Sequence, residues 1–361
     1  MSGSLAAIFG GPAQRIELRR LELPSAGGET MLVRVLGCTL CGSDLHTVEG
    51  RRTVAVPTIL GHEIVGELIG IGESATAIDV TGEKLRIGDR ITWSIVANCG
   101  ECFYCARGLP QKCKRAVKYG HEALQPGREL TGGLAEHCLL APGTKVVKLP
   151  AELPLEVACP ANCATATVAA AVVAAGNVCD RTVCILGAGL LGLTACAMCD
   201  SLGASQVICV DIHPARLERA KAFGASQVAS PAELAKVLQD ATGGHGVDVA
   251  LEFSGASSAF AAILPQVRLG GRVVLVGSVF PGEPVPIHLE QIVRRNLSIV
   301  GIHNYAPEHL LAAVQFLTAN HERYPFSDLV AVWKPLEEVR EAFELARDAS
   351  KIRVGVRPGA A

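Results

Sequence analysis

The feature that most constrains the fold is a glycine-rich turn in ILGAGLLG, where Gly187, Gly189 and Gly192 form the pattern G-x-G-x-x-G. The apolar run TVCIL precedes the turn, and a helix is expected over 190–203. Asp211 closes the next apolar run, 19 residues after Gly192. Strand, tight turn, helix and distal carboxylate together predict a dinucleotide-binding βαβ unit. The carboxylate favours NAD, because it accepts from ribose hydroxyls and repels a 2′-phosphate.

The rest of the chain shows two different patterns of apolar residues. From about residue 164, apolar strands such as QVICVD, VDVALEF, RVVLVG and LSIVGI alternate with helical segments, including 214–223. This alternation predicts a parallel sheet covered on both faces. The first 155 residues instead carry short β-type runs such as MLVRVLG and DRITWSIV, and the chain ends with two helical segments and the strand IRVGVRP. A length of 361 residues suits two domains.

The amino-acid composition of the chain argues against several classes of protein function. The formal net charge is −2 and aromatic residues make up 4% of the chain, which does not suit a nucleic-acid-binding protein. No run reaches the roughly 18 apolar residues of a membrane-spanning helix, and the N-terminal residues lack the layout of a signal peptide. We therefore expect a soluble cytoplasmic protein, without a nucleic-acid or membrane partner, whose 14 cysteines are mostly reduced.

Four cysteines, Cys99, Cys102, Cys105 and Cys113, lie in the loop NCGECFYCARGLPQKC at 98–113. The spacing places four thiolates on one compact loop, which suits a closed structural zinc site. An iron–sulfur cluster is the alternative, because similar cysteine spacing occurs there. The other motifs of the chain favour zinc.

A second candidate metal set is dispersed along the chain: Cys41 in CGSDLH, His62 and Glu63 in GHE, and Cys163 in PANCATAT. Two sulfurs and one nitrogen suit zinc with one coordination position left open. Each residue taken alone could be a buried thiol or a core histidine. Their combination is what favours a catalytic zinc.

These motifs together make the chain resemble the medium-chain, zinc-dependent alcohol dehydrogenases over nearly its whole length. The likeness is carried by CGSDLH, LGHEIVG, GDRI, the four-cysteine loop, GGLAEH, GAGLLG with Asp211, and LGGRVVLVG. It implies an α/β fold, with a Rossmann doubly wound parallel sheet and a β-rich GroES-like catalytic domain. The implied domains are 1–163 (GroES-like), 164–303 (Rossmann, NAD-binding) and 304–361 (return to the catalytic domain), with the active site in the cleft between them.

The resemblance also implies cofactors and a reaction. Two Zn²⁺ per chain, one catalytic and one structural, and NAD(H) would serve the interconversion of an alcohol and its aldehyde or ketone. Cys41, His62 and Cys163 correspond to the catalytic zinc ligands, and Glu63 to a carboxylate that approaches the metal during ligand exchange. In this region Glu156 and Cys159 compete with Cys163 as the third ligand, and the residues after Cys163 favour the latter.

Further roles come from the same resemblance. Asp44 corresponds to the group that orients the ligand histidine. Ser43 corresponds to the hydroxyl that takes the substrate proton, and His46 to the relay that passes it to solvent. The implied coenzyme contacts are Gly187, Gly189, Leu190, Leu191, Gly192, Asp211, Arg216, Thr167 and Arg353.

The substrate is less constrained. PANCATATVAAA, KYGHE and GGLAEHCLL resemble a subgroup associated with phosphonate catabolism, which implies a hydroxyalkylphosphonate and cations near the zinc. Lys118, His121 and His303 are the candidates, although Lys118 and His121 fit an exposed loop equally well.

The sequence also leaves two alternative functions open and predicts an oligomer. A polyol or amino-alcohol dehydrogenase, of the sorbitol or threonine type, is the second candidate, and a catalytically silent NAD-binding regulator is the third. The apolar segment LSIVGI at 297–302 would form a sheet edge, and exposed apolar edges usually pair. We therefore expect a homodimer or homotetramer.

Overall fold

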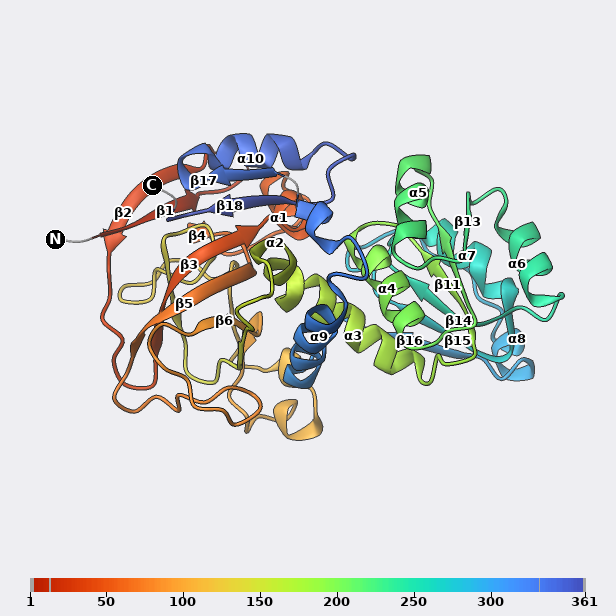
Figure 1. Cartoon of the computed structure of the whole chain (residues 1–361), viewed down its shortest axis with the longest axis horizontal. Helices are drawn as coiled ribbons and strands as arrows, with labels where there is room; N and C mark the ends of the chain where they lie inside the picture. The colour runs from red at the N-terminus through yellow and green to blue at the C-terminus, as the bar shows by residue number, and fades with distance from the viewer. Residues whose placement is uncertain (1–2, 13, 331, 360–361) are drawn as a thin grey trace. The chain divides into compact units, whose positions relative to one another are not determined.

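The computed structural model describes residues 3–12, 14–330 and 332–359. The chain divides into two compact units (Figure 1). The first unit is Met1–Cys163, Ala306–Glu322 and Phe326–Ala361, and the second is Ala164–Tyr305 and Arg323–Pro325. Each unit has its own sheet and its own buried apolar cluster.

The second unit is built on a six-stranded sheet in the order β13-β12-β11-β14-β15-β16. All neighbouring strands in it run parallel, which confirms the predicted Rossmann sheet. The central strands are nearly continuous apolar runs because helices cover both faces. The strands are β11 (Thr182–Leu186), β12 (Gln206–Val210), β13 (Gln227–Ala229), β14 (Val247–Glu252), β15 (Val267–Leu275) and β16 (Ser298–Gly301).

Helices α3 and α4 pack together on one face of this sheet, and apolar side chains of α6 and α7 join the core on the other face. Helices α4 and α5 begin at residues 190 and 214 as predicted, and end within two residues of the predicted ends. The helices are α3 (Ala164–Ala175), α4 (Leu190–Ser201), α5 (Pro214–Ala222), α6 (Leu234–Thr242), α7 (Ser257–Ile263), α8 (Leu289–Arg294) and the 3-10 turn η4 (Leu264–Gln266).

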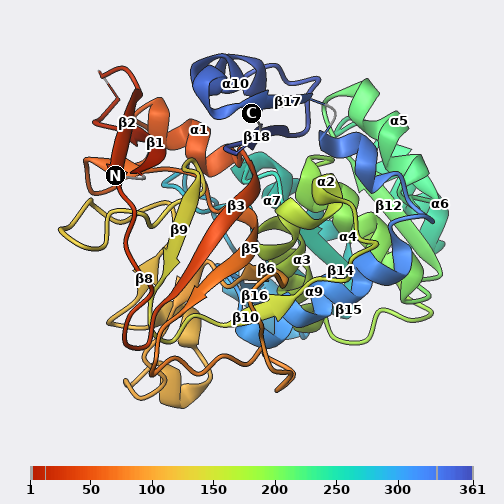
Figure 2. The same cartoon turned by 60° about the vertical axis from the view of Figure 1, so that its left-hand side comes forward.

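The first unit holds a sheet in the order β10-β6-β5-β3-β18-β17, with β9 paired to β3. Strand β18 comes from the C-terminal end of the chain and pairs antiparallel with β3 (Figure 2). Two smaller sheets, β2-β1-β4 and β7-β8, lie beside it in the same unit. The strands are β1 (Gly3–Phe9), β2 (Glu17–Glu22), β3 (Met31–Thr39), β4 (Thr58–Ile59), β5 (Glu63–Ile71), β6 (Arg90–Trp93), β7 (Val96–Ala97), β8 (Val117–Lys118), β9 (His137–Leu140), β10 (Val146–Lys148), β17 (Val332–Pro335) and β18 (Val354–Arg357).

Helices of the first unit are mostly short. The two helical segments predicted after residue 304 are α9 and α10, followed by β18 as predicted, whereas β17 and α1 were not predicted. Among the described residues no single helix has the length and apolar character to cross a membrane, although the bent pair α2–η3 and α3 passes that test on length and composition when taken together. The helices are α1 (Gly42–Val48), α2 (Leu155–Ala158), α9 (Pro307–Asn320), α10 (Val339–Ala346) and the 3-10 turns η1 (Cys105–Arg107), η2 (Pro110–Lys112), η3 (Cys159–Asn162), η5 (Phe326–Val330) and η6 (Leu336–Glu338).

Candidate zinc and coenzyme sites

Three side chains from separate segments of the first unit converge. Cys41 precedes α1 as its N-cap, His62 lies between β4 and β5, and Cys163 follows η3. One ligand atom from each lies within 4.8 Å of the other two. The two thiols are half-buried and the imidazole is buried. Two sulfurs and one nitrogen at this spacing fit a zinc ion that keeps one position open.

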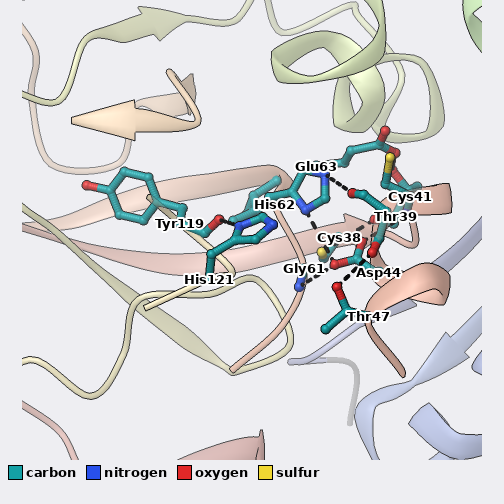
Figure 3. Close-up of polar contacts among 12 residues, drawn as sticks. Cys38, Thr39, Cys41, Asp44, Thr47, Gly61, His62, Glu63, Tyr119 and His121 are labelled. Carbon is teal, nitrogen blue, oxygen red and sulfur yellow. Dashed lines mark hydrogen bonds and ion pairs between the residues drawn. The ribbon is translucent and has the colours of Figure 1, made fainter. Parts of the chain in front are cut away.

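Asp44 holds this group together from the first turn of α1. Its Oδ2 accepts from the backbone N–H of Cys41 at 2.9 Å, and its Oδ1 accepts from that of Gly61 at 3.3 Å. Oδ1 also lies 3.4 Å from His62 Nδ1 (Figure 3). Burial, the largest single effect, lowers the pKa of His62, but the charge and hydrogen bond of Asp44 together with those of Cys41 outweigh it and raise that pKa to about 10. Asp44 therefore orients the imidazole with Nε2 turned away from the carboxylate.

Ser43 and His46 lie on the same short helix. Ser43 Oγ is 3.3 Å from His62 Nε2, so the hydroxyl stands beside the nitrogen that Asp44 leaves available. His46 follows three residues later, and side chains at this spacing share one face of a helix. Burial lowers the pKa of His46, and the charge of Arg51 acts in the same direction.

Glu63 is fully buried and bound by two partners. Arg353 Nε and Nη2 donate to its two oxygens at 3.0 and 3.1 Å, and Thr39 Oγ1 donates at 2.6 Å. Arg353 Nη2 also lies 3.8 Å from Cys41 Sγ. Burial raises the pKa of Glu63, and the charge of Arg353 opposes that rise. The structure thus places Arg353, which the sequence pattern assigned to the coenzyme, against the carboxylate and a thiol of the first unit.

The sequence pattern missed Asn162, whose side chain is fully buried. Its Nδ2 donates to the backbone oxygens of His62 and Trp93, both at 2.9 Å, and its Oδ1 accepts from the N–H of Ile64 at 3.2 Å. The amide therefore ties the segment that carries His62 to the residue next to Cys163. A polar side chain inside the otherwise apolar run before Cys163 was the available signal.

The competing third ligands lie elsewhere. Cys159 is fully buried. Its sulfur lies against Gly37, where an added Cβ would stand 3.2 Å from it. Glu156 is half-buried in α2. Neither joins Cys41 and His62 in the group of metal-binding atoms found among the described residues.

The four-cysteine loop forms a second group. Sulfur–sulfur distances are 3.5 Å for Cys99–Cys113 and Cys102–Cys105, 3.9 Å for Cys102–Cys113 and 4.0 Å for Cys99–Cys105. Ligands about 2.3 Å from one tetrahedral ion lie about 3.8 Å apart, so the spacing fits a single zinc. A hydrogen bond from the backbone N–H of Glu101 and a weaker effect of the Arg115 side chain lower the pKa of Cys99 to about 6. A lowered pKa favours the thiolate that zinc requires.

The glycine turn of the second unit has the geometry of a nucleotide loop. Gly187 adopts a φ of +97°, and a Cβ at Gly192 would lie 1.7 Å from the Gly187 oxygen. Asp211 Oδ2 accepts from the N–H of Ala188 at 2.6 Å, and its Oδ1 from that of His213 at 2.8 Å. The pairing of β11 with β12 brings the turn and Asp211 to the same edge of the sheet.

The other predicted coenzyme residues lie in both units. Leu190 and Leu191 are the first two residues of α4, Arg216 is in α5 and Thr167 is in α3, all in the second unit. Arg353 belongs to the first unit. Of the candidate substrate cations, Lys118 and His121 are half-buried in the first unit, whereas His303 is exposed in the second.

Comparisons with known proteins give the family. The model of the alcohol dehydrogenase GroES-like domain matches residues 27–151, and that of the zinc-binding dehydrogenases matches 191–319. The L-threonine 3-dehydrogenase of Pyrococcus horikoshii is 32% identical over 357 residues, covering 96% of this chain and 97% of that enzyme. The chain belongs to the medium-chain zinc-dependent alcohol dehydrogenases. It is an oxidoreductase that interconverts an alcohol and a carbonyl compound with zinc and a nicotinamide coenzyme, and not the silent regulator held as an alternative.

Further members of this dehydrogenase family are similar along the whole chain. The 5-exo-hydroxycamphor dehydrogenase of Pseudomonas putida is 30% identical over 337 residues, covering 91% of each chain. The crystal structure of an alcohol dehydrogenase from Thermotoga maritima superposes with a TM-score of 0.93 at 30% identity, covering 99% of this chain and 100% of that one. The recognised family and the predicted fold class are confirmed.

Proposed function

We propose that Cys41, His62 and Cys163 hold the catalytic zinc and that the four-cysteine loop holds the structural zinc. The observation that carries the first assignment is the convergence of two thiols and an imidazole within 4.8 Å. The spacing of the four thiols supports the second. The glycine turn and Asp211 would bind NAD, because a carboxylate at the ribose position disfavours a 2′-phosphate.

When bound, zinc supplies Lewis-acid stabilisation of an alkoxide and the nicotinamide supplies a hydride acceptor. The residues of the chain handle the proton. Ser43 Oγ, beside His62 Nε2, would accept the hydroxyl proton of the alcohol and pass its own proton to His46, which releases it to solvent. Asp44 keeps the imidazole oriented, and Arg353 with Thr39 keeps Glu63 in place beside it. The balance is one alcohol and NAD⁺ converted to one carbonyl compound, NADH and a proton.

The test is a zinc count on the Cys41→Ser variant. Wild-type protein should contain two zinc ions per chain, and the variant one, with turnover abolished and NAD affinity kept because the glycine turn lies in the second unit. The matched control is Cys179→Ser, an exposed free thiol outside both groups, which should keep both ions. Two zinc ions or full activity in Cys41→Ser would refute the assignment.

The domain boundaries of the proposal are 1–163 and 304–361 for the catalytic domain and 164–303 for the coenzyme domain. The division of the chain into two compact units, with a boundary after Cys163, supports them. A cytoplasmic location is supported by the 14 cysteines, all free thiols in the structure, because disulfides are rare in reducing compartments.

Two substrate classes remain in competition. A hydroxyalkylphosphonate is supported by the half-buried Lys118 and His121 in the same unit as the catalytic group. An amino-alcohol or polyol is favoured by relatives named L-threonine 3-dehydrogenase. Reduction of NAD with hydroxyalkylphosphonates, threonine, sorbitol and plain alcohols, followed at the absorbance of NADH, ranks the two classes.

A further inference from the structure

Glu252 is a fully buried acid at the carboxyl end of a central strand of the second unit. It is the last residue of β14 and is 0% exposed. One of its carboxyl oxygens, Oε1, accepts from the hydroxyl of Ser254 and from the backbone N–H of Gly255, the latter at 2.8 Å. The other oxygen, Oε2, has no hydrogen-bond partner among the described residues. The carboxyl group thus holds the loop that follows its own strand.

The end of β14 lies where the order of strands in the sheet reverses. From β11 the chain continues to β12 and β13 on one side of the sheet, and then returns to β14 and β15 on the other side (Figure 1). Leu186 at the end of β11 pairs with Glu252 at the end of β14. In open α/β sheets a dinucleotide binds in the crevice outside the carboxyl ends of the strands at this point. Glu252 therefore lies beneath the expected coenzyme crevice.

The loop that Glu252 holds is packed against the glycine turn. A Cβ on Gly187 would lie 3.0 Å from the backbone nitrogen of Ser254. A Cβ on Gly255 would lie 2.7 Å from the backbone oxygen of Gly277, in the loop after β15. Ser254 and Gly255 are the two residues that donate to Glu252 Oε1. A shift of their loop would therefore disturb the glycine turn and the loop after β15 together.

The charge state of Glu252 also suits this place. Burial raises the pKa of Glu252, and hydrogen bonds from Ser254 and Gly255 oppose that rise. No cation among the described residues forms an ion pair with the carboxyl group, and a buried carboxylate without a cation is unfavourable. A neutral carboxyl group does not repel the negatively charged pyrophosphate of a dinucleotide, whereas a carboxylate at the same place would.

We propose that Glu252 is a positioning residue for the coenzyme, which holds the loop 253–256 against the glycine turn through Ser254 and Gly255. The inference rests on the proposed function, because it assumes that NAD binds at the glycine turn. The side chain acts through the loop and does not touch the coenzyme. An uncharged side chain that keeps the acceptor should therefore replace Glu252, whereas a side chain without an acceptor should not.

The first experiment measures NAD affinity by calorimetry in the zinc-loaded full chain. Glu252→Gln should bind NAD as the wild type does, because the amide oxygen still accepts from Ser254 and Gly255. Glu252→Ala should bind NAD about tenfold more weakly, because both donors lose their acceptor. The matched control is Asp248→Ala, which removes another acid of β14, at the opposite end of the strand, where it accepts from the N–H of Thr182. This control should keep the wild-type NAD affinity.

The second experiment separates positioning from a purely structural role. The melting temperature of each protein is measured without NAD and at one fixed NAD concentration, because the rise that a ligand produces depends on its affinity. Asp248→Ala should melt at a lower temperature than the wild type but show the same rise with NAD. Glu252→Ala should show a smaller rise, and Glu252→Gln should restore it. Ser254→Ala, which leaves β14 unchanged, should also show a smaller rise, and it decides the question if Glu252→Ala does not fold.

The proposal has outcomes that would overturn it. One is wild-type NAD affinity in Glu252→Ala, and another is equally weak binding by Glu252→Gln and Glu252→Ala. A loss of affinity in Asp248→Ala as large as that in Glu252→Ala would also overturn it, because such a loss would reflect general damage to the sheet. A wild type that binds no NAD would instead refute the coenzyme assignment of the proposed function.

Discussion

Among single residues, the Asn162 amide contacts three backbone groups, at His62, Ile64 and Trp93. It also directly precedes Cys163. One buried side chain thus links the segment that carries His62 with the segment that carries Cys163. Buried polar groups left without a partner carry a penalty of roughly 1–3 kcal/mol each. We therefore expect Asn162 to contribute to folding and, through the proposed ligands, to metal retention.

Asn162→Ala should lower the free energy of unfolding by about 2–4 kcal/mol, because two carbonyls and one N–H lose their partner. It should also release the catalytic zinc more readily, since the His62 backbone is no longer held. The measurements are urea unfolding and zinc content after dialysis against a chelator. Asn177→Ala is the control, because its exposed side chain accepts one local hydrogen bond, from the N–H of Cys179, and it should stay within about 0.5 kcal/mol of wild type. The role of Asn162 is refuted if its variant matches this control in both measurements.

Sequence patterns found site residues only where a local motif carries the chemistry. Cys41, His62 and the cysteines of the loop stand in short recognisable motifs. Arg353 was assigned to the coenzyme from the family resemblance, and its contact with Glu63, 290 residues away in the sequence, was not predicted because nothing local indicates it. Contacts that depend on tertiary folding were therefore out of reach.

Among the elements, the glycine turn before α4 contains one glycine that the fold requires and another that coenzyme binding is expected to require. A Cβ on Gly192 would meet the Gly187 oxygen at 1.7 Å, whereas a Cβ on Gly189 would meet no protein atom within 4 Å. Gly192 therefore serves the packing of the helix against the strand. Gly189 leaves open the space that a pyrophosphate needs at the start of the helix.

Gly192→Ala should lower the free energy of unfolding by roughly 1–3 kcal/mol, because the turn must open to admit a methyl group. Gly189→Ala should fold as the wild type does, yet bind NAD at least about tenfold more weakly, because its methyl group enters the pyrophosphate position. Thermal unfolding and calorimetric titration with NAD measure the two effects, and each variant serves as the control for the other. Wild-type NAD affinity in Gly189→Ala would contradict the assignment of the turn.

Element boundaries followed the sequence where a strand and a turn lead into a helix. Helices α4 and α5 began where they were predicted, because a strand and a turn precede each of them. Helix α1 escaped prediction because its seven residues show no apolar stripe and depend on the contact of Asp44 with the Cys41 backbone. Strand β17 escaped because its place is set by pairing with β18.

At the scale of the whole molecule, the second unit ends in a strand with one unpaired side. Strand β16 is last in the order of its sheet, so none of the described strands pairs with its outer edge. Its residues Ser298, Ile299 and Val300 are only half-buried. An apolar edge of this kind is expected to pair with a second copy of the chain.

Val300→Lys should therefore halve the mass of the particle in solution, because a charged side chain at the edge opposes strand pairing. Size-exclusion chromatography with light scattering measures that mass. Ile87→Lys is the matched control, since it places the same charge on an apolar side chain that is 59% exposed in the first unit, and it should keep the wild-type mass. Zinc content and NAD affinity should be unchanged in both variants, because neither residue lies in the zinc groups or the glycine turn. A wild type that elutes as a single chain, or a Val300→Lys variant that keeps the wild-type mass, would show that the edge is not an interface.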